Sequence, residues 1–245
     1  MKIVLTVLTL ILIVLTTYLN HVYAGFFDRI GEFDLRDPYL ELTNGEVTVG
    51  DTSKGETLYL VLGDSLSRGV GATSYKNTYP YLMMQREPSL RIVNKAQPGA
   101  RLVHVFSQIG DAETLSPSII TVLIGTNDVF NRTPIDEFSK EYDRMLSELD
   151  KKSAKTIVLT IPYLGSPDSV PFPFTILLDQ AIKRYNSKIK EAVRKHPKVK
   201  MIDLYEKSAE SFKRSRDLYS KDLFHPSDKG YILISDLLKN ANLSQ

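Results

Sequence analysis

The chain contains 245 residues, of which 42% are hydrophobic and 24% are charged, so it can bury the core of one medium-sized domain and is not expected to be disordered. Its 31 lysines and arginines and 29 acidic residues leave a net charge of only +2, which offers no overall field to attract nucleic acid. The absence of cysteine excludes disulfides, thiolate metal sites and a cysteine nucleophile. No histidine pair has the HExxH spacing of a zinc site, so no metal or other cofactor is expected.

The first 24 residues differ from the rest of the chain. Lys2 is followed by an uncharged apolar run of 17 residues, Ile3 to Leu19, and Ala24 precedes Gly25. This pattern favours an export signal that is cleaved after Ala24, and a retained membrane anchor is the alternative. Because Lys2 stays on the inner side of the membrane, both interpretations predict that the remaining chain is secreted or extracytoplasmic.

Residues 25–56 are polar and rich in turn formers, with one short alternating piece, "GEVTV", and we interpret them as a linker or a small β appendage. Residues 57–245 have a more regular pattern. Apolar, β-branched runs begin near residues 57, 91, 118, 155 and 199 and predict five buried strands. Helical patterns separate these runs. The alternation predicts an α/β domain whose five-stranded parallel sheet is covered by helices on both faces.

The clearest helical pattern is "TPIDEFSKEYDRMLSELDKK", residues 133–152. Thr133 is the expected cap and Pro134 suits the first turn. The apolar residues on one face of this helix are Ile135, Phe138, Tyr142, Met145 and Leu149. A second helix is predicted to begin near residue 176 and to end at Pro197.

Polar residues follow the predicted strands. The first strand runs into "GDSL" with Ser65, the second into "NKAQPGAR", the third into "IGTND", and "DLFHP" follows the fifth. The carboxyl ends of parallel strands meet at one edge of the sheet, so these segments are expected to lie close together. A serine hydroxyl becomes a nucleophile when a base removes its proton and a third group orients that base. We expect Ser65 to be the nucleophile, His225 the base and Asp222 the orienting acid.

An oxyanion formed at Ser65 would need donors aimed at it before the reaction. The candidates are the backbone N–H groups of Ser65 and Gly99 and the side-chain amide of Asn127. Each residue taken alone also has an interpretation without a catalytic role. Ser65 could be a helix cap, Gly99 and Asn127 could be turn formers, and His225 could be a surface histidine. Their order along the chain, each at a strand end, favours the chemical interpretation. No GxGxxG or GxxxxGK[ST] pattern occurs, so "GDS" is not interpreted as a phosphate loop.

With these four blocks the sequence resembles the GDSL or SGNH hydrolases, from Thr57 to about Leu238. The resemblance implies a flavodoxin-like three-layer α/β/α sandwich, a Ser-His-Asp triad and hydrolysis of carboxylic esters through an acyl-enzyme. Lysophospholipases, thioesterases and carbohydrate deacetylases are among the members. One departure is that Leu223 and Phe224 follow the triad aspartate where many members have a small residue, which suggests a more apolar wall near the histidine.

We therefore expect an exported serine esterase acting on short or medium acyl, lysophospholipid or carbohydrate acetyl esters. An acyltransferase that uses the same acyl-enzyme is one alternative, and a catalytically silent binding module on the same fold is another. The expected partner is a small-molecule, lipid or carbohydrate ester and not nucleic acid. Contact with a membrane is expected only through the N-terminal segment.

The loop after the fourth strand, "IPYLGSPDSVPFPFTILL", is rich in proline and in apolar residues. Tyr163, Phe172 and Phe174 either line a pocket for the acyl chain or pack the loop onto the next helix. Two other polar residues receive structural interpretations. Asp203 is expected to cap a helix, and His196 is expected to lie at a helix end.

Overall fold

The computed structural model describes residues 2–34, 48–49, 57–87, 89–110, 112, 114–152, 154–165, 170 and 174–239. Most of the predicted linker, residues 25–56, lies outside these ranges or has no described side chains. Phe172 also lies outside the described residues.

The core of the molecule is a six-stranded sheet of order β1-β3-β2-β4-β5-β6. Its strands are β1 (Thr48–Val49), β2 (Thr57–Gly63), β3 (Leu90–Asn94), β4 (Ile119–Leu123), β5 (Lys155–Leu159) and β6 (Lys200–Ile202). The five strands from β2 to β6 are parallel, as predicted. The short β1, from the "GEVTV" piece, pairs antiparallel with β3 and so extends the same sheet.

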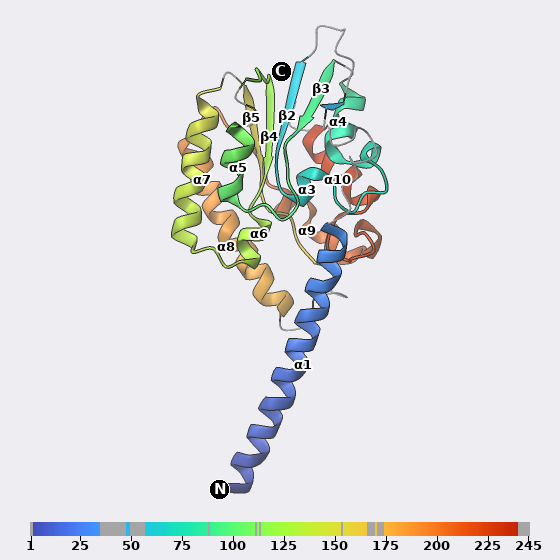
Figure 1. Cartoon of the computed structure of the whole chain (residues 1–245), viewed down its shortest axis with the longest axis vertical. Coiled ribbons are helices and arrows are strands. Elements are labelled where there is room, and N and C mark those ends of the chain that lie inside the picture. Colours follow the sequence, from blue (N-terminus) through green and yellow to red (C-terminus); the bar gives the residue numbers. More distant parts are fainter. Residues whose placement is uncertain are drawn as a thin grey trace.

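Helices cover both faces of the sheet and complete the three-layer α/β/α sandwich (Figure 1). One face carries α5 (Leu102–Gly110), α7 (Ile135–Asp150) and α8 (Phe174–Lys195). The other face carries α4 (Tyr79–Arg86), α9 (Leu204–Arg214) and α10 (Asp228–Lys239). Short helices follow two strands: α3 (Ser65–Arg68) after β2 and α6 (Thr126–Phe130) after β4. Two 3-10 turns, Tyr75–Asn77 and Arg216–Leu218, complete the described helical elements.

The predicted apolar face of α7 packs onto the sheet. Phe138, Tyr142, Met145 and Leu149 are buried, and Ile135 at the start of the helix is partly buried. The predicted cap was wrong. Pro134 occupies the cap position of α7, and the Thr133 hydroxyl donates to the carboxylate of Asp128 instead.

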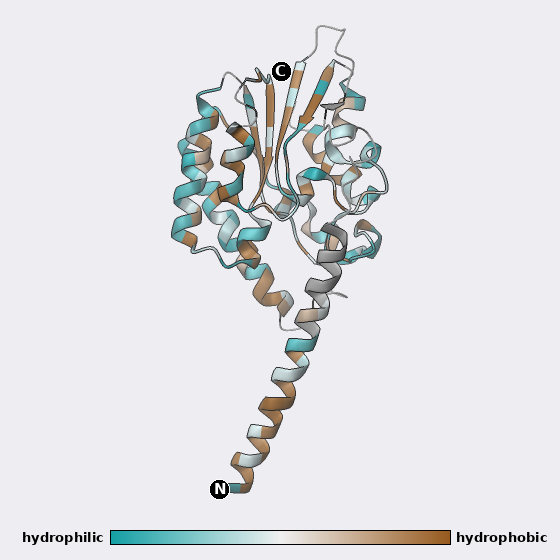
Figure 2. Ribbon diagram, viewed as in Figure 1, coloured by the Kyte–Doolittle hydropathy of each residue, from teal (hydrophilic) through white to brown (hydrophobic). Residues whose placement is uncertain are grey.

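The helix α1 (Lys2–Asp34) extends away from the sandwich (Figure 1). Its segment Lys2–His21, 20 residues with a mean hydropathy of 2.3, is long and apolar enough to cross a membrane, and none of it is buried. Figure 2 shows this segment as predominantly hydrophobic. The helix continues through Ala24 and Gly25 without interruption.

We call the edge of the sheet at which the five parallel strands end the carboxyl edge. Helices that follow parallel strands run back across the sheet, so they begin at this edge. The segments that contain Ser65, Gly99 and Asn127 all lie there, after β2, β3 and β4. The fold therefore concentrates the polar sequence blocks on one side of the molecule.

Candidate active site

Ser65 is the first residue of α3, directly after the turn that ends β2. Gly63, with a φ of +140°, leaves the strand in a conformation that favours glycine, and a Cβ there would overlap the Leu123 carbonyl oxygen. The side chain of Asp64 caps α3 by accepting from the Leu66 N–H at 3.0 Å. Ser65 itself is thus not the helix cap, and its hydroxyl is available for other contacts.

Ser65, His225 and Asp222 are joined by hydrogen bonds in series. The Ser65 Oγ lies 2.9 Å from His225 Nε2, and His225 Nδ1 lies 2.5 Å from Asp222 Oδ2. Ser65 is 3% exposed, Asp222 1% and His225 0%, so this series lies almost entirely out of water. A hydroxyl, an imidazole and a carboxylate in this order can move a proton from the serine to the histidine while the carboxylate holds the ring.

The second carboxylate oxygen of Asp222 is also fully engaged. Oδ1 accepts from the Ser220 hydroxyl at 2.6 Å and from the backbone N–H groups of Phe224 and His225 at 2.9 and 3.0 Å. Burial alone would raise the pKa of Asp222, but the hydrogen bonds from His225, Ser220 and the backbone outweigh it and hold the pKa below its usual value of 3.8. The carboxylate therefore stays charged and fixed beside the imidazole.

Leu223 and Phe224 form the turn between Asp222 and His225. Leu223 adopts a left-handed conformation, with a φ of +61°. The ring of Phe224 is buried and packs edge-on against the imidazole of His225, with the ring centroids 4.9 Å apart. It also packs against Phe130 of α6 at 5.4 Å. The apolar wall near the histidine that the sequence suggested is thus present.

The two other candidate oxyanion donors lie on neighbouring loops at the same edge. Gly99 has a φ of +73°, and its N–H donates to no group in the described part of the chain. The Asn127 amide donates one hydrogen bond to the Ala100 carbonyl at 2.9 Å. An amide nitrogen carries two hydrogens, so Asn127 keeps a second donor. The contact with Ala100 links the loops that carry Gly99 and Asn127.

The sequence matches the GDSL-like lipase/acylhydrolase family over residues 61–233. The chain belongs to this family. The matched range contains the blocks around Ser65, Gly99, Asn127 and His225, so the hydrogen-bonded series lies within the family domain.

Two curated relatives are themselves named as ester hydrolases. A GDSL-like esterase of Mycobacterium tuberculosis is 26% identical over 187 residues, which cover 73% of this chain and 59% of the esterase. A spore germination lipase of Bacillus licheniformis is 24% identical over 208 residues, covering 75% of this chain and 95% of the lipase. This chain thus spans less than two thirds of the esterase and nearly all of the lipase.

Solved structures share the fold. A member of the lipolytic G-D-S-L family from Veillonella parvula superimposes with a TM-score of 0.64 at 18% identity, covering 77% of this chain and all of that protein. This likeness shows the α/β three-layer fold, and the family match places the chain among the GDSL-like lipases and acylhydrolases.

Buried amides and carboxylates that the sequence analysis did not single out support the site of this GDSL hydrolase. Gln108 of α5 accepts from the Gly63 N–H at 2.9 Å and donates to the Gly63 carbonyl at 2.8 Å. It therefore holds both polar groups of the last residue of β2, just before Ser65. The sequence shows only a glutamine among the apolar residues of this helix, and its full burial is seen only in the structure.

Asp128, next to Asn127, connects the "GTND" segment to the residue that follows the "NKAQPGAR" segment through a hydrogen bond. One carboxylate oxygen accepts from the Leu102 N–H at 2.8 Å and the other from the Thr133 hydroxyl at 3.0 Å. Burial raises the pKa of Asp128, although both hydrogen bonds act in the opposite direction. Asp128 thus fixes the start of α5 and the end of α6 around Gly99 and Asn127.

The loop after α3 packs directly against the histidine loop. Gly71 has a φ of +95°, and a Cβ there would lie 2.6 Å from the Pro226 carbonyl oxygen and 2.8 Å from the Cβ of His225. The Tyr231 hydroxyl of α10 donates to the Val70 carbonyl at 2.7 Å. Only glycine permits this close approach, so Gly71 brings the serine and histidine segments together.

The three predicted substrate-binding residues lie in different environments. Tyr163 is 8% exposed, and Lys213 lies over its ring at 5.2 Å from the centroid. Phe174 is partly buried at the first position of α8 and packs against the core. Phe172 is outside the described residues. Tyr163 therefore has little free surface, while Phe174 is partly accessible.

The structural interpretations of Asp203 and His196 are confirmed. Asp203 caps α9 by accepting from the Glu206 N–H at 3.2 Å. His196, just after α8, pairs with Asp150 at 2.5 Å. His104 accepts from the Arg101 N–H at 2.9 Å, at the start of α5. None of these residues contacts the Ser65 series in the described part of the chain.

Proposed function

We propose that this GDSL hydrolase cleaves carboxylic esters through an acyl-enzyme formed on Ser65. The observation that carries the proposal is the buried pair of hydrogen bonds from Ser65 Oγ to His225 Nε2 and from His225 Nδ1 to Asp222 Oδ2. The order of groups is that required of a nucleophile, its base and an orienting carboxylate.

The proposed reaction begins when Ser65 Oγ attacks the ester carbonyl and His225 Nε2 takes its proton. The C–O bond to the alcohol then breaks, and the same proton passes from His225 to the leaving alcohol. Water repeats the sequence at the acyl-enzyme, releasing the acid and restoring the Ser65 hydroxyl. Asp222 remains a carboxylate throughout and stabilises the imidazolium.

The tetrahedral intermediates carry a negative oxygen, for which three donors are proposed. They are the backbone N–H groups of Ser65 and Gly99 and the amide of Asn127. The Ser65 N–H belongs to the first turn of α3, where backbone donors lack intrahelical acceptors. The N–H of Gly99, which donates to no group among the described residues, and the second amide hydrogen of Asn127 support their assignment.

The proposed substrates are short or medium acyl esters, lysophospholipids or carbohydrate acetyl esters. Phe174 is the described residue that best fits an acyl-binding role, with Phe172 as its companion. Transfer of the acyl group to an alcohol acceptor is the alternative, because the same acyl-enzyme would serve it. Measuring products with and without an added alcohol separates the two reactions.

The hydrolase is proposed to act outside the cytoplasm. The support is the apolar segment Lys2–His21 with its single early positive charge. As an export signal or as an anchor, this segment directs the following domain across the membrane.

The test of the proposed function is labelling by a fluorophosphonate probe together with hydrolysis of p-nitrophenyl acetate. Ser65→Ala should abolish both. Ser67→Ala is the matched control, because Ser67 lies in the same short helix and its hydroxyl donates to the Leu62 carbonyl. Labelling that survives in Ser65→Ala would refute the assignment of the nucleophile.

A further inference from the structure

The direction of β1 shows where the N-terminal segment joins the sandwich. Thr48 pairs with Val93 and Val49 pairs with Ile92, so β1 runs opposite to β3. Because β3 runs toward the carboxyl edge, Thr48 is the end of β1 that lies nearer to that edge. The chain therefore enters the sheet from the side on which Ser65 lies.

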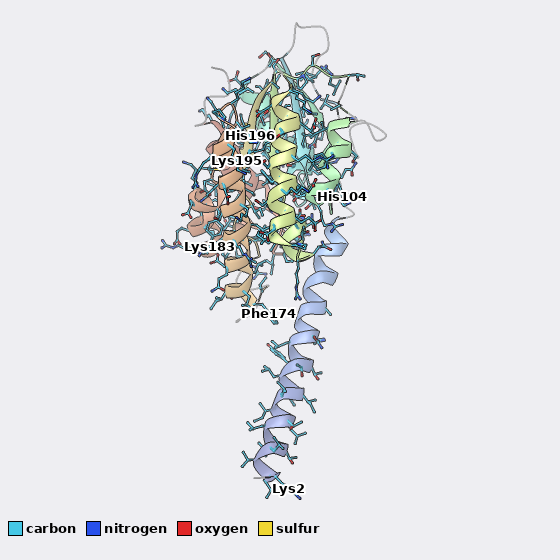
Figure 3. The ribbon with its side chains drawn as sticks, turned by 90° about the vertical axis from the view of Figure 1, so that its left-hand side faces the viewer. Lys2, His104, Phe174, Lys183, Lys195 and His196 are labelled. Atoms are coloured by element: carbon cyan, nitrogen blue, oxygen red, sulfur yellow. The ribbon has the colours of Figure 1, made fainter. Side chains whose placement is uncertain are left out.

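The helix α1 leaves the molecule on the same side. Figure 3 shows Phe174, at the first position of α8, at the end of the sandwich from which α1 projects, and His196 at the opposite end. The apolar side chains of α1 from Ile3 to Leu15 are exposed by 48% to 81%. At a rise of about 1.5 Å per residue, the 20 residues Lys2–His21 match the roughly 30 Å hydrocarbon core of a bilayer.

Exposed apolar side chains of the sandwich are also concentrated at the carboxyl edge. Among the described residues outside α1 they are Val103, Ile176, Leu177, Met201 and Ile232. Four of these five lie in the first two turns of α5, α8 and α10. Figure 2 shows the start of α8 as a hydrophobic end of that helix. Ile176 and Leu177 are 49% and 55% exposed there.

Two arginines accompany this apolar surface. Arg132 and Arg184 line the same pocket as Leu177, about 480 Å³ in volume, between the end of α6 and the first half of α8. The arginine ion pairs of the described residues belong to Arg86, Arg144 and Arg214, so neither of these two is paired there. Arg132 also has a φ of +53°, a conformation that favours glycine after a helix end. This left-handed position thus carries an exposed charged side chain that forms no ion pair with another described residue.

We propose that the carboxyl edge faces the bilayer that α1 spans, and that the enzyme takes amphiphilic esters from the surface of that bilayer. Ile176 and Leu177 contact the interface, and Arg132 and Arg184 attract anionic headgroups. The active site then opens toward the layer in which such esters are held. This inference rests on the proposed ester hydrolase function and on retention of α1 as an anchor.

The test uses the absence of cysteine in the chain. Full-length Leu177→Cys is labelled with an environment-sensitive fluorophore and reconstituted in vesicles of phosphatidylcholine and phosphatidylglycerol that contain a nitroxide-labelled lipid. The matched control is Lys198→Cys, an exposed position in the turn after α8 at the opposite end of the sandwich. We expect quenching several-fold greater at position 177 than at position 198. Equal quenching, or greater quenching at position 198, would overturn the proposal.

Two further measurements make the result specific. Quenching at position 177 should be greater in vesicles with phosphatidylglycerol than in vesicles of phosphatidylcholine alone. Arg132→Gln combined with Arg184→Gln should remove most of this difference. An unchanged difference would overturn the role of the arginines. The mass of the chain recovered from membranes should correspond to a retained α1, and a chain beginning at Gly25 would overturn the proposal.

Hydrolysis of soluble p-nitrophenyl butyrate by the same labelled proteins separates this inference from the proposed function. Hydrolysis without selective quenching at position 177 contradicts only the orientation. Selective quenching without hydrolysis contradicts only the esterase function. Ile176→Cys provides a second position in the same turn if Leu177→Cys does not fold.

Discussion

The carboxylate of Asp228 accepts two hydrogen bonds from Thr73, at 2.8 Å from its N–H and at 2.6 Å from its hydroxyl. The Asn77 amide donates to the same carboxylate at 3.0 Å. Thr73 follows Ser65 in the loop after α3, and Asp228 follows His225 at the start of α10. These bonds therefore join the segment that carries the candidate nucleophile to the segment that carries its base.

Asp228→Asn should weaken this junction. The amide would place a donor where three donors already point at the carboxylate, so about 1–2 kcal/mol of the free energy of unfolding should be lost. The kcat for a soluble ester should fall several-fold with little change in KM. The control is Asp236→Asn, which removes a surface ion pair with Arg86 at the other end of α10 and should change neither quantity appreciably. Equal effects of the two variants on kcat would contradict a positioning role for Asp228.

Gln108→Met should lower both stability and activity. The buried N–H of Gly63 would lose its acceptor, at a cost of about 1–3 kcal/mol, and the turn before Ser65 would lose its support. Asn186→Leu is the matched control, since Asn186 of α8 makes the same pair of bonds to the N–H and carbonyl of Ile161. Urea denaturation should show similar losses for both variants, whereas kcat should fall mainly in Gln108→Met. A comparable fall in both would mean that the effect is only one of global stability.

Asn127→Ala should lower kcat by about 10²–10³ with little change in KM, because it removes one prearranged oxyanion donor. Asn131→Ala provides the comparison, since its exposed amide donates to the Asn127 carbonyl at the end of the same short helix. Steady-state kinetics with a p-nitrophenyl ester measure both variants. A rise in KM alone for Asn127→Ala would assign this residue to substrate binding.

Asp222 should make the free energy of unfolding depend on pH in the acidic range. Its pKa is lowered in the folded state, so its carboxylate contributes stability above the usual value of 3.8 that is lost as the pH falls through the lowered pKa. The free energy of unfolding of Asp222→Asn should be smaller than that of the wild type at pH 6. The difference should shrink as the pH falls below 4, because the carboxyl of the unfolded wild type takes up a proton there before the folded carboxyl does. A difference that stays constant from pH 6 to pH 3 would show that this linkage is absent.

The acyl-chain preference tests Phe174 and Phe172. If they line an acyl pocket, each buried methylene contributes up to about 0.8 kcal/mol, so kcat/KM should rise several-fold from the acetyl to the hexanoyl ester. Phe172→Ala and Phe174→Ala should flatten this rise. Measurements with p-nitrophenyl acetate, butyrate, hexanoate and octanoate give the profile. A falling profile that neither substitution alters would indicate a small pocket for acetyl esters.

Much of the candidate site was predictable because its residues lie in short contiguous blocks. "GDSL" and "GTND" each follow a strand, and the carboxyl ends of parallel strands meet at one edge. "DLFHP" follows α9 and a 3-10 turn, and it comes just before α10. The supporting contacts were not predictable in the same way. Gln108 contacts Gly63 across 45 residues, and Asp228 contacts Thr73 across 155. Glutamine and aspartate occur on many helices, and no local sequence pattern predicts which distant residue each will contact.

The sequence by itself determined the alternation of strands and helices, the order of the parallel strands along the chain and which residues are candidates for the reactive groups, because hydrophobic periodicity and strand-end residues are local properties. Tertiary structure alone decided that Thr48–Val49 joins the sheet as an antiparallel edge strand. It also decided that the Thr133 hydroxyl bonds to Asp128 and does not cap α7, and that the Asp222 carboxylate is held by Ser220 as well as by His225. The physical reason is the same in each case. A polar group takes whichever partner the packed chain brings within about 3 Å, and that choice is made only when the layers of the fold come together.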